Sequence, residues 1–251
     1  MTETILITGG TGKFGRQFVE HFAGKGWQVL FTTTCQENAK SLIEEIGSGN
    51  CLIPFIVDFT KPQAVKETVA KIKKDGYVIN HLINNARSLE FLQTDLLGQT
   101  RRDDFLAEYL IDVVVPYELS MALFNTQPHQ LRTITNIGSQ YGLVAANPAL
   151  YEDYPRQSPI QYGVAKAALI HLTKELAVRF SGFDIRVNCI AYGGVSGRVD
   201  AGFEARYAQL NPSGRMLSEA DLIGPLELLV SDRCKAINGQ TIQADGGWTL
   251  W

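Results

Sequence analysis

A tyrosine and a lysine stand four residues apart, at Tyr162 and Lys166, near the start of an amphipathic run that ends at about Phe180. Residues at this spacing project from the same side of a helix, one turn above the other. An ammonium beside a phenol favours the phenolate, so the pair could exchange a proton with a bound substrate. A helix can also carry this pair without any chemistry, so the interpretation depends on the rest of the chain.

A glycine-rich turn follows the first apolar segment. Residues 4–8 are rich in β-branched types, the sequence GGTGKFG follows at 9–15, and apolar residues then recur at helical spacing as far as Phe22. Glycines let the backbone approach a pyrophosphate closely, and a helix N-terminus offers free N–H groups. A glycine motif can be a simple turn, but its position between a strand and a helix favours a dinucleotide site.

The second predicted strand, 27–32, bears on the choice of cofactor. It ends in Thr32-Thr33-Thr34-Cys35 and carries no carboxylate there, whereas an acidic residue at this position binds the ribose of NAD. The hydroxyl of Thr33 and the ammonium of Lys13 could instead receive the 2′-phosphate of NADP. The alternative is that the threonines only finish the strand and that Lys13 is solvated. The pattern favours NADP over NAD.

Strand-like and helix-like segments alternate along the remaining chain. Further strands are predicted at 51–57, 81–83, 133–137, 186–190 and 240–244, and helices at 37–46, 62–74, 104–125, 162–180 and 219–230. This alternation is typical of a parallel sheet with helices on both faces. No linker or repeat divides the chain, so we expect one α/β domain over 1–251, a Rossmann-type doubly wound sheet of about seven strands.

Composition excludes several other classes. The chain has 251 residues, of which 45% are hydrophobic and 20% charged, and its formal net charge is −3. A slightly acidic chain of this kind is not expected to bind nucleic acid or a membrane surface. The four cysteines are scattered and the four histidines form no cluster, so we expect reduced thiols, a cytoplasmic protein and no metal site.

Polar residues that could do chemistry follow several of the predicted strands. They are Asp58, Asn84, Ser139 and the turn Tyr192-Gly193-Gly194. Ligands of doubly wound sheets bind beyond the carboxyl ends of the strands, so these residues should meet the glycine turn at one edge.

Taken together, these motifs resemble the short-chain dehydrogenase/reductase family over essentially the whole chain. The matching pieces are Thr8-Gly9-x-x-Gly12-x-x-Gly15, Asp58, Asn84-Asn85-Ala86, Ser139, Tyr162, Lys166, Arg186-Val187-Asn188 and Asp245-Gly246-Gly247. The resemblance implies an NAD(P)-dependent oxidoreductase that transfers hydride between nicotinamide and a carbonyl or secondary alcohol. In this scheme Tyr162 is the general acid/base, Ser139 binds the substrate oxygen and Lys166 binds the nicotinamide ribose.

The resemblance also implies a set of cofactor contacts and an oligomer, a homotetramer or homodimer. The implied contacts are Gly9, Thr11, Gly12, Lys13, Phe14, Gly15, Thr33, Asp58, Phe59, Asn85, Ala86, Tyr162, Lys166, Gly193 and Val195. A fourth catalytic position, an Asn in the family, aligns with Asp112. A negative Asp112 near Lys166 would partly cancel the field that favours the phenolate of Tyr162, so we expect a more alkaline pH optimum than an Asn would give. Arg87 and Tyr192 depart from the family's Gly and Pro.

The substrate is less clearly indicated. An insertion at about 145–161 carries Tyr154 and Arg156, and the family's mobile substrate loop corresponds to about 194–216. The insertion and the chain's last residues are similar to those of reductases of the flagellin modification protein A type. That similarity implies a sugar or sugar-phosphate substrate, bound by Ser139, Arg87 and Tyr154. The candidate anion partners are Arg87, Arg156 and Arg198. The alternatives are a 3-oxoacyl or small-ketone reductase and a non-catalytic protein that senses NADP.

Overall fold

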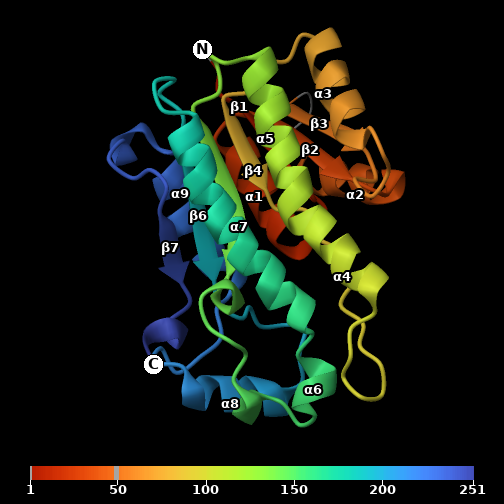
Figure 1. Cartoon of the computed structure of the whole chain (residues 1–251). Coiled ribbons are helices and arrows are strands. Elements are labelled where there is room, and N and C mark those ends of the chain that lie inside the picture. The colour runs from red at the N-terminus through yellow and green to blue at the C-terminus, as the bar shows by residue number, and fades with distance from the viewer. Residues whose placement is uncertain (1, 48–50) are drawn as a thin grey trace.

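Parallel strands form one sheet in this computed structural model, which describes residues 2–47 and 51–251 (Figure 1). Within these residues the strand order is β3-β2-β1-β4-β5-β6-β7, and every pairing is parallel. The strands are β1 (Thr4–Ile7), β2 (Gln28–Thr33), β3 (Leu52–Ile56), β4 (His81–Asn84), β5 (Thr133–Ser139), β6 (Arg186–Tyr192) and β7 (Thr241–Ala244). The predicted doubly wound α/β fold is confirmed.

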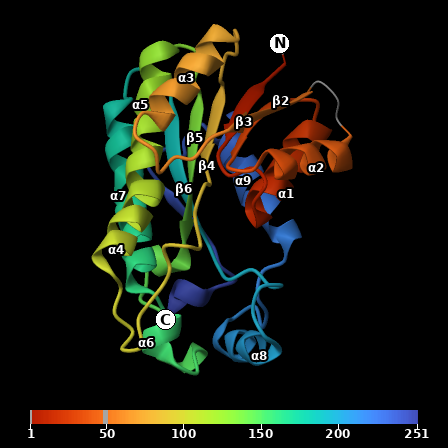
Figure 2. The same ribbon diagram turned by 90° about the vertical axis from the view of Figure 1, so that its right-hand side faces the viewer.

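Helices cover both faces of the sheet (Figure 2). One face carries α1 (Lys13–Gly24), α2 (Gln36–Ile46) and α9 (Ile223–Val230), and the other carries α3 (Ala64–Lys74), α5 (Val115–Thr126) and α7 (Ile160–Arg179). Successive side chains of a strand point to opposite faces. Leu6 therefore packs in the core beneath α5 and α7, whereas Ile5 and Ile7 pack beneath α1 and α9. Each strand residue of β1 is buried for this reason.

The order in which strands are added to the sheet reverses at β1. The chain adds β2 and β3 on one side of it and then returns to add β4, β5, β6 and β7 on the other. The connections that leave β1 and β4 diverge, and a crevice at this point is where such sheets bind ligands. Beyond the same edge lie α6 (Tyr154–Gln157) and α8 (Ala201–Leu210), toward which β6 and β7 point in Figure 1.

The helix predicted at 104–125 is interrupted. It consists of α4 (Arg102–Tyr109), a π turn (Leu110–Val114) and α5, and the N–H of Val115 donates to the carbonyl of Leu110, five residues earlier. Pro116 accounts for the interruption, because proline has no N–H to donate to the carbonyl of Asp112 four residues before it. The helical ladder widens there, and π turns of this kind are frequent at functional sites.

Two segments that were expected to be irregular contain helices. The predicted substrate loop at 194–216 includes α8, and the predicted insertion at 145–161 includes α6 and a 3₁₀ turn at Pro148–Leu150. Conversely, the helix predicted at 219–230 begins with a 3₁₀ turn, Glu219–Leu222, before α9. Both inserted helices pack at the carboxyl edge of the sheet, so they form part of the site described below.

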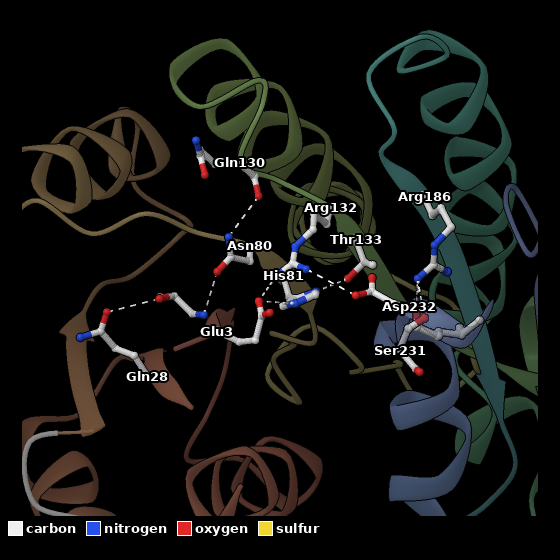
Figure 3. Close-up of polar contacts among 12 residues, drawn as sticks. Glu3, Gln28, Asn80, His81, Gln130, Arg132, Thr133, Arg186, Ser231 and Asp232 are labelled. Atoms are coloured by element: carbon white, nitrogen blue, oxygen red, sulfur yellow. Dashed lines mark hydrogen bonds and ion pairs between the residues drawn. The ribbon is translucent and has the colours of Figure 1, made fainter. Parts of the chain in front are cut away.

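The amino edge of the sheet carries a separate polar network (Figure 3). The imidazole of His81 contacts the Thr133 hydroxyl through Nδ1 at 2.7 Å, and its Nε2 lies 3.4 Å from a Glu3 carboxylate oxygen. Arg132 donates to the same Glu3 carboxylate and lies 3.7 Å from Asp232. Burial lowers the pKa of His81 to about 4. The network therefore holds a neutral imidazole at the end of the molecule opposite the carboxyl edge.

Candidate active site

The glycine turn after β1 is shaped for close approach of a ligand. Gly9 has φ +66°, a conformation that favours glycine, and a Cβ there would lie 2.9 Å from the Cα of Ala86. A Cβ on Gly15 would lie only 2.1 Å from the carbonyl oxygen of Gly9. Gly15 therefore allows α1 to pack against the turn and does not itself line the cavity.

The ends of β1 and β4 are joined by hydrogen bonds around Thr8. Its hydroxyl accepts from the backbone N–H groups of Asn85 and Ala86, both at 2.9 Å, and the Asn85 side chain donates to the Thr8 carbonyl at 2.9 Å. Asn84 instead donates to Asn136 within the sheet, at 2.8 Å. These bonds hold the two sides of the switch point together and fix the position of the segment that carries Arg87.

A cavity of about 1060 Å³ opens at this edge. Its volume suits a dinucleotide together with a small substrate. The predicted site residues that line it are Gly9, Thr11, Gly12, Lys13, Phe14, Thr33, Asp58, Phe59, Asn85, Ala86, Arg87, Ser139, Tyr162, Lys166, Gly193 and Val195. Three predicted site residues, Gly15, Asp112 and Tyr154, are not among the lining residues.

Lys166 is buried behind Tyr162 and held from two sides. Its ammonium donates to the carbonyl of Ile137 at 3.1 Å and lies 3.0 Å from a carboxylate oxygen of Asp112. Burial, the largest single influence, would lower the pKa of Lys166, but Asp112 and Tyr162 together outweigh it and the pKa is raised. The ammonium is therefore a fixed positive charge. Asp112 does not touch the cavity and acts on it through Lys166.

Two cations flank the ring of Tyr162. The guanidinium of Arg87 lies 4.8 Å from the ring centroid and the Lys166 ammonium lies 5.7 Å from it. Both distances are within the range of cation–π attraction. Ser139 lines the same cavity, and its hydroxyl oxygen accepts from the N–H of Tyr141 at 3.2 Å. Ser139, Tyr162 and Lys166, which the sequence predicts to converge, line the same cavity.

Glu108 is a member of this cluster that the sequence analysis missed. Its side chain is completely buried, and neither carboxyl oxygen has a hydrogen-bond donor among the described residues. Burial, followed by the negative charge of Asp112, raises the pKa of Glu108 to about 7. The available signal was its spacing, since Glu108 precedes Asp112 by four residues on one helix face.

The opposite part of the cavity is lined by aromatic residues. The hydroxyls of Tyr141 and Tyr151 lie 2.8 Å apart, and burial raises the pKa of both, so both remain neutral hydrogen-bonding groups. Tyr154, the predicted substrate residue, packs beside Tyr151 with ring centroids 5.8 Å apart but outside the lining. Tyr151, and not the predicted Tyr154, therefore lines the cavity. Arg156 lies 3.4 Å from Asp153 and is likewise outside the lining.

The side chain of Lys13 turns away from the predicted 2′-phosphate position. Its ammonium donates to the carbonyl of Ser196 and lies 4.0 Å from Glu219, both beyond β6. Thr33 lies at the end of β2, where its hydroxyl contacts that of Thr11 at 2.8 Å. The predicted pair of Lys13 and Thr33 is therefore not formed. Another cation, Lys61, lines the cavity after β3.

In the described part of the chain, no three acidic, histidine or cysteine side chains gather where they could hold a metal ion. No described helix is long and apolar enough to cross a membrane.

A glycine cradle at the switch point and a Ser–Tyr–Lys set beside it define an oxidoreductase that uses a nicotinamide dinucleotide. A family model described as enoyl-(acyl carrier protein) reductase matches residues 13–249. The chain belongs to the short-chain dehydrogenase/reductase family and acts on a CH–OH group with NAD(P).

Relatives cover the chain to different extents. The 3-oxoacyl-[acyl-carrier-protein] reductase FabG of Thermotoga maritima is 27% identical over 257 residues, which cover 98% of this chain and 97% of the relative. Post-translational flagellin modification protein A of Campylobacter coli is 37% identical over 117 residues, which cover 47% of this chain and 46% of the relative. The predicted similarity to the flagellin modification type is confirmed for about half of the chain.

Solved structures are similar over the whole chain. A short-chain dehydrogenase from Leptospira borgpetersenii with bound NAD⁺ is 26% identical, with a TM-score of 0.87 and coverage of 99% of this chain and 93% of that one. A structure of ElxO with bound NADP is 25% identical, with a TM-score of 0.86 and full coverage of both chains. These structures contain different forms of the cofactor, so they support NAD(P) binding without distinguishing NAD from NADP.

Proposed function

We propose that this oxidoreductase acts on a hydroxylated, negatively charged substrate of the sugar or sugar-phosphate class and uses NADP. The observation that carries the proposal is the polar, cationic lining of the cavity around Tyr162. Arg87 lies over the Tyr162 ring, and Arg198 and the Tyr151 hydroxyl contribute to the same cavity. Guanidinium groups bind carboxylate and phosphate with paired hydrogen bonds, and tyrosine offers both a ring and a hydroxyl to a polyol.

The chemistry follows from the positions of four side chains. A bound nicotinamide dinucleotide supplies or accepts the hydride at the reacting carbon. In reduction, Tyr162 donates its phenolic proton to the carbonyl oxygen, and in oxidation its phenolate removes that proton from the alcohol. Ser139 donates a hydrogen bond to the same oxygen. Lys166, fixed by Asp112 and the Ile137 carbonyl, favours the phenolate by its charge and has a further N–H for the cofactor ribose.

The preference for NADP rests on the residues around the end of β2. Thr33 and Thr34 line the cavity with hydroxyl groups, and neither they nor Thr32 carries a negative charge. Lys61 supplies the nearby cation that Lys13 was expected to supply, although Asp58 lies 3.6 Å from it. A phosphate at this position would meet donors and a positive charge, whereas an NAD-type carboxylate is missing.

A homodimer or homotetramer is part of the proposal. Large apolar side chains are exposed along the outer surface of α4, α5 and α7. They are Leu106, Tyr109, Tyr117, Val164 and Val178. Exposed apolar groups of this density are typical of a surface that binds a partner, and symmetric association of identical chains is the commonest way to cover one.

Cofactor titration with the purified protein, NADPH against NADH, is the first test. We expect tighter binding of NADPH, turnover on a panel of sugar and sugar-phosphate carbonyls, and loss of that turnover in the Tyr162→Phe variant with cofactor binding retained. Tighter binding of NADH would contradict the NADP assignment. Binding without turnover of any carbonyl would replace the enzyme proposal by the cofactor-sensing alternative.

A second candidate substrate class is a 3-oxoacyl thioester, which the full-length similarity to FabG favours. The segment beyond Arg87 exposes Leu89, Leu96 and Leu97, which could contact an acyl chain. Including a 3-oxoacyl thioester in the panel separates the two classes. A kcat/KM for the thioester at least as high as for every anionic sugar would overturn the sugar assignment and leave the oxidoreductase class intact.

A further inference from the structure

Glu108 belongs to a group of charges beside Tyr162, most of which are buried. Its side chain is 0% exposed and Asp112 is 2% exposed, one helical turn further along. Charges from three segments act on Glu108. They are Asp112 in the π turn, Lys166 on α7 and Arg87 in the segment after β4. The group therefore contains the buried Glu108, Asp112 and Lys166, with Arg87 exposed at the cavity.

The two carboxyl groups of Glu108 and Asp112 cannot both be negative at low cost. They lie one helical turn apart, both are buried, and neither Glu108 oxygen has a hydrogen-bond partner among the described residues. Lys166, at 3.0 Å, is paired with Asp112 and not with Glu108. Glu108, a buried carboxyl beside a carboxylate and without a donor, keeps its proton, because like charges in a buried site strongly disfavour a second ionisation.

We propose that Glu108 is a positioning residue of the active site, which holds one proton beside the Asp112 carboxylate and thereby sets the charge that surrounds Tyr162. With the proton in place the two acids carry −1, and Lys166 and Arg87 carry +2, so the group has a net charge of +1. When the proton leaves, the net charge is 0. A positive group favours the phenolate of Tyr162, and a neutral group favours the phenol. This inference rests on the proposed role of Tyr162 as the proton donor and acceptor.

The charge count explains how the site can favour the phenolate of Tyr162 although Asp112 lies beside Lys166. An Asp beside Lys166 would cancel the lysine's charge, and the site would lose its preference for the phenolate. Arg87, where the family has a glycine, restores one positive charge, and the proton on Glu108 prevents a second negative charge. Glu108, Asp112 and Arg87 therefore act as a set.

The test compares Glu108→Gln with the matched control Glu67→Gln, an exposed glutamate on α3. Glutamine keeps the shape of the protonated acid and stays neutral at every pH. The readout is the ultraviolet absorbance of tyrosinate during a pH titration of the full-length, cofactor-free protein. Subtracting the same titration in a Tyr162→Phe background isolates Tyr162. Above neutral pH we expect about tenfold more Tyr162 phenolate relative to phenol in Glu108→Gln than in Glu67→Gln, the effect of one nearby charge.

Turnover supplies the second measurement. We expect the pH dependence of kcat/KM to contain a step near neutral pH in the parent and in Glu67→Gln, and the step to be absent in Glu108→Gln. Glu108→Met, of similar size but without a hydrogen-bonding group, should also lack the step if the proton and not the packing is responsible. Identical tyrosinate titrations of Glu108→Gln and Glu67→Gln would overturn the inference.

Failure of the proposed function gives a different result. If no substrate is turned over but the tyrosinate titrations differ as expected, the role of Glu108 is supported and the enzyme assignment fails. If turnover depends on Tyr162 but Glu108→Gln leaves both the titration and the pH profile unchanged, the function is supported and the role of Glu108 is overturned.

Discussion

We infer that Asp112 acts on the site through its charge, which lies 3.0 Å from Lys166. Its carboxylate offsets part of the positive field that favours the phenolate of Tyr162. We predict that Asp112→Asn shifts the pH–rate profile toward acid by about one pH unit, because the offset is removed while the size of the side chain is kept. The measurement is kcat/KM as a function of pH. Identical profiles for the parent and the variant would show that Asp112 has no electrostatic role.

At the residue scale, local patterns were predictable and side-chain directions were not. Tyr162 and Lys166 were found because a spacing of four residues fixes their common face. Tyr154 was predicted to contact substrate, whereas Tyr151 lines the cavity, because the sequence does not show which tyrosine of an insertion points inward. That direction depends on the 3₁₀ turn at Pro148–Leu150 and on the hydroxyl contact with Tyr141. Lys13 was misplaced for a similar reason, since its partner Ser196 is 183 residues away.

The π turn between α4 and α5 is the element that brings Asp112 to Lys166. We predict that Pro116→Ala returns an N–H donor to the helix, closes the π turn and moves the Asp112 carboxylate away from Lys166. Turnover should fall on the order of tenfold or more, because small displacements in a site are costly. Thermal stability should be unchanged or higher, because alanine favours helix interiors over proline.

The control for this change is Pro62→Ala, an exposed proline that precedes α3. It should alter neither turnover nor the pH profile. If Pro116→Ala retained full activity, the π turn would be a packing feature and not a device for positioning Asp112.

At the element scale, the sheet was predicted well and the helix interruption was not. Strands that are buried on both faces and separated by helices allow few topologies. The interruption at Leu110–Val114 was overlooked because the apolar pattern from 104 to 125 continues through it, and only Pro116 indicates a break. The helices in the two loop regions were missed because α6 and α8 pack at the site and not on the sheet, so they carry no strong pattern.

Two buried ionisable groups, one toward each end of the molecule, make the stability of the fold depend on pH in opposite directions. His81 binds its proton less readily when folded, with a pKa of about 4 against the ordinary 6.5, so its contribution to stability is lost as pH falls through that window. Glu108 binds its proton more readily when folded, with a pKa of about 7 against 4.5, so its contribution is lost as pH rises through that window. The two effects oppose each other where the windows overlap.

We predict that His81→Gln makes the protein less sensitive to acid, although the loss of the Thr133 and Trp27 contacts lowers stability at neutral pH. The lowering of the His81 pKa from 6.5 to about 4 corresponds to a loss of about 3 kcal/mol in the free energy of unfolding between pH 6.5 and pH 4. Glu3 does not cancel it, because its carboxylate is held by Arg132. The measurement is the free energy of unfolding in urea at several pH values. Parallel curves of unfolding free energy against pH for the parent and the variant would contradict the lowered pKa of His81.

The position of the two chain ends has a practical consequence for attaching the protein to a surface or a reporter. In Figure 1 the start of β1 lies at the amino edge of the sheet, and the final residues lie near α8, on the side of the cavity. Trp248 packs against Tyr207 of α8 with ring centroids 4.3 Å apart. A bead, electrode or fluorescent partner joined before β1 would leave the cavity open to solvent. The same partner joined after Trp251 would stand near α8, whose Tyr207 lines the cavity.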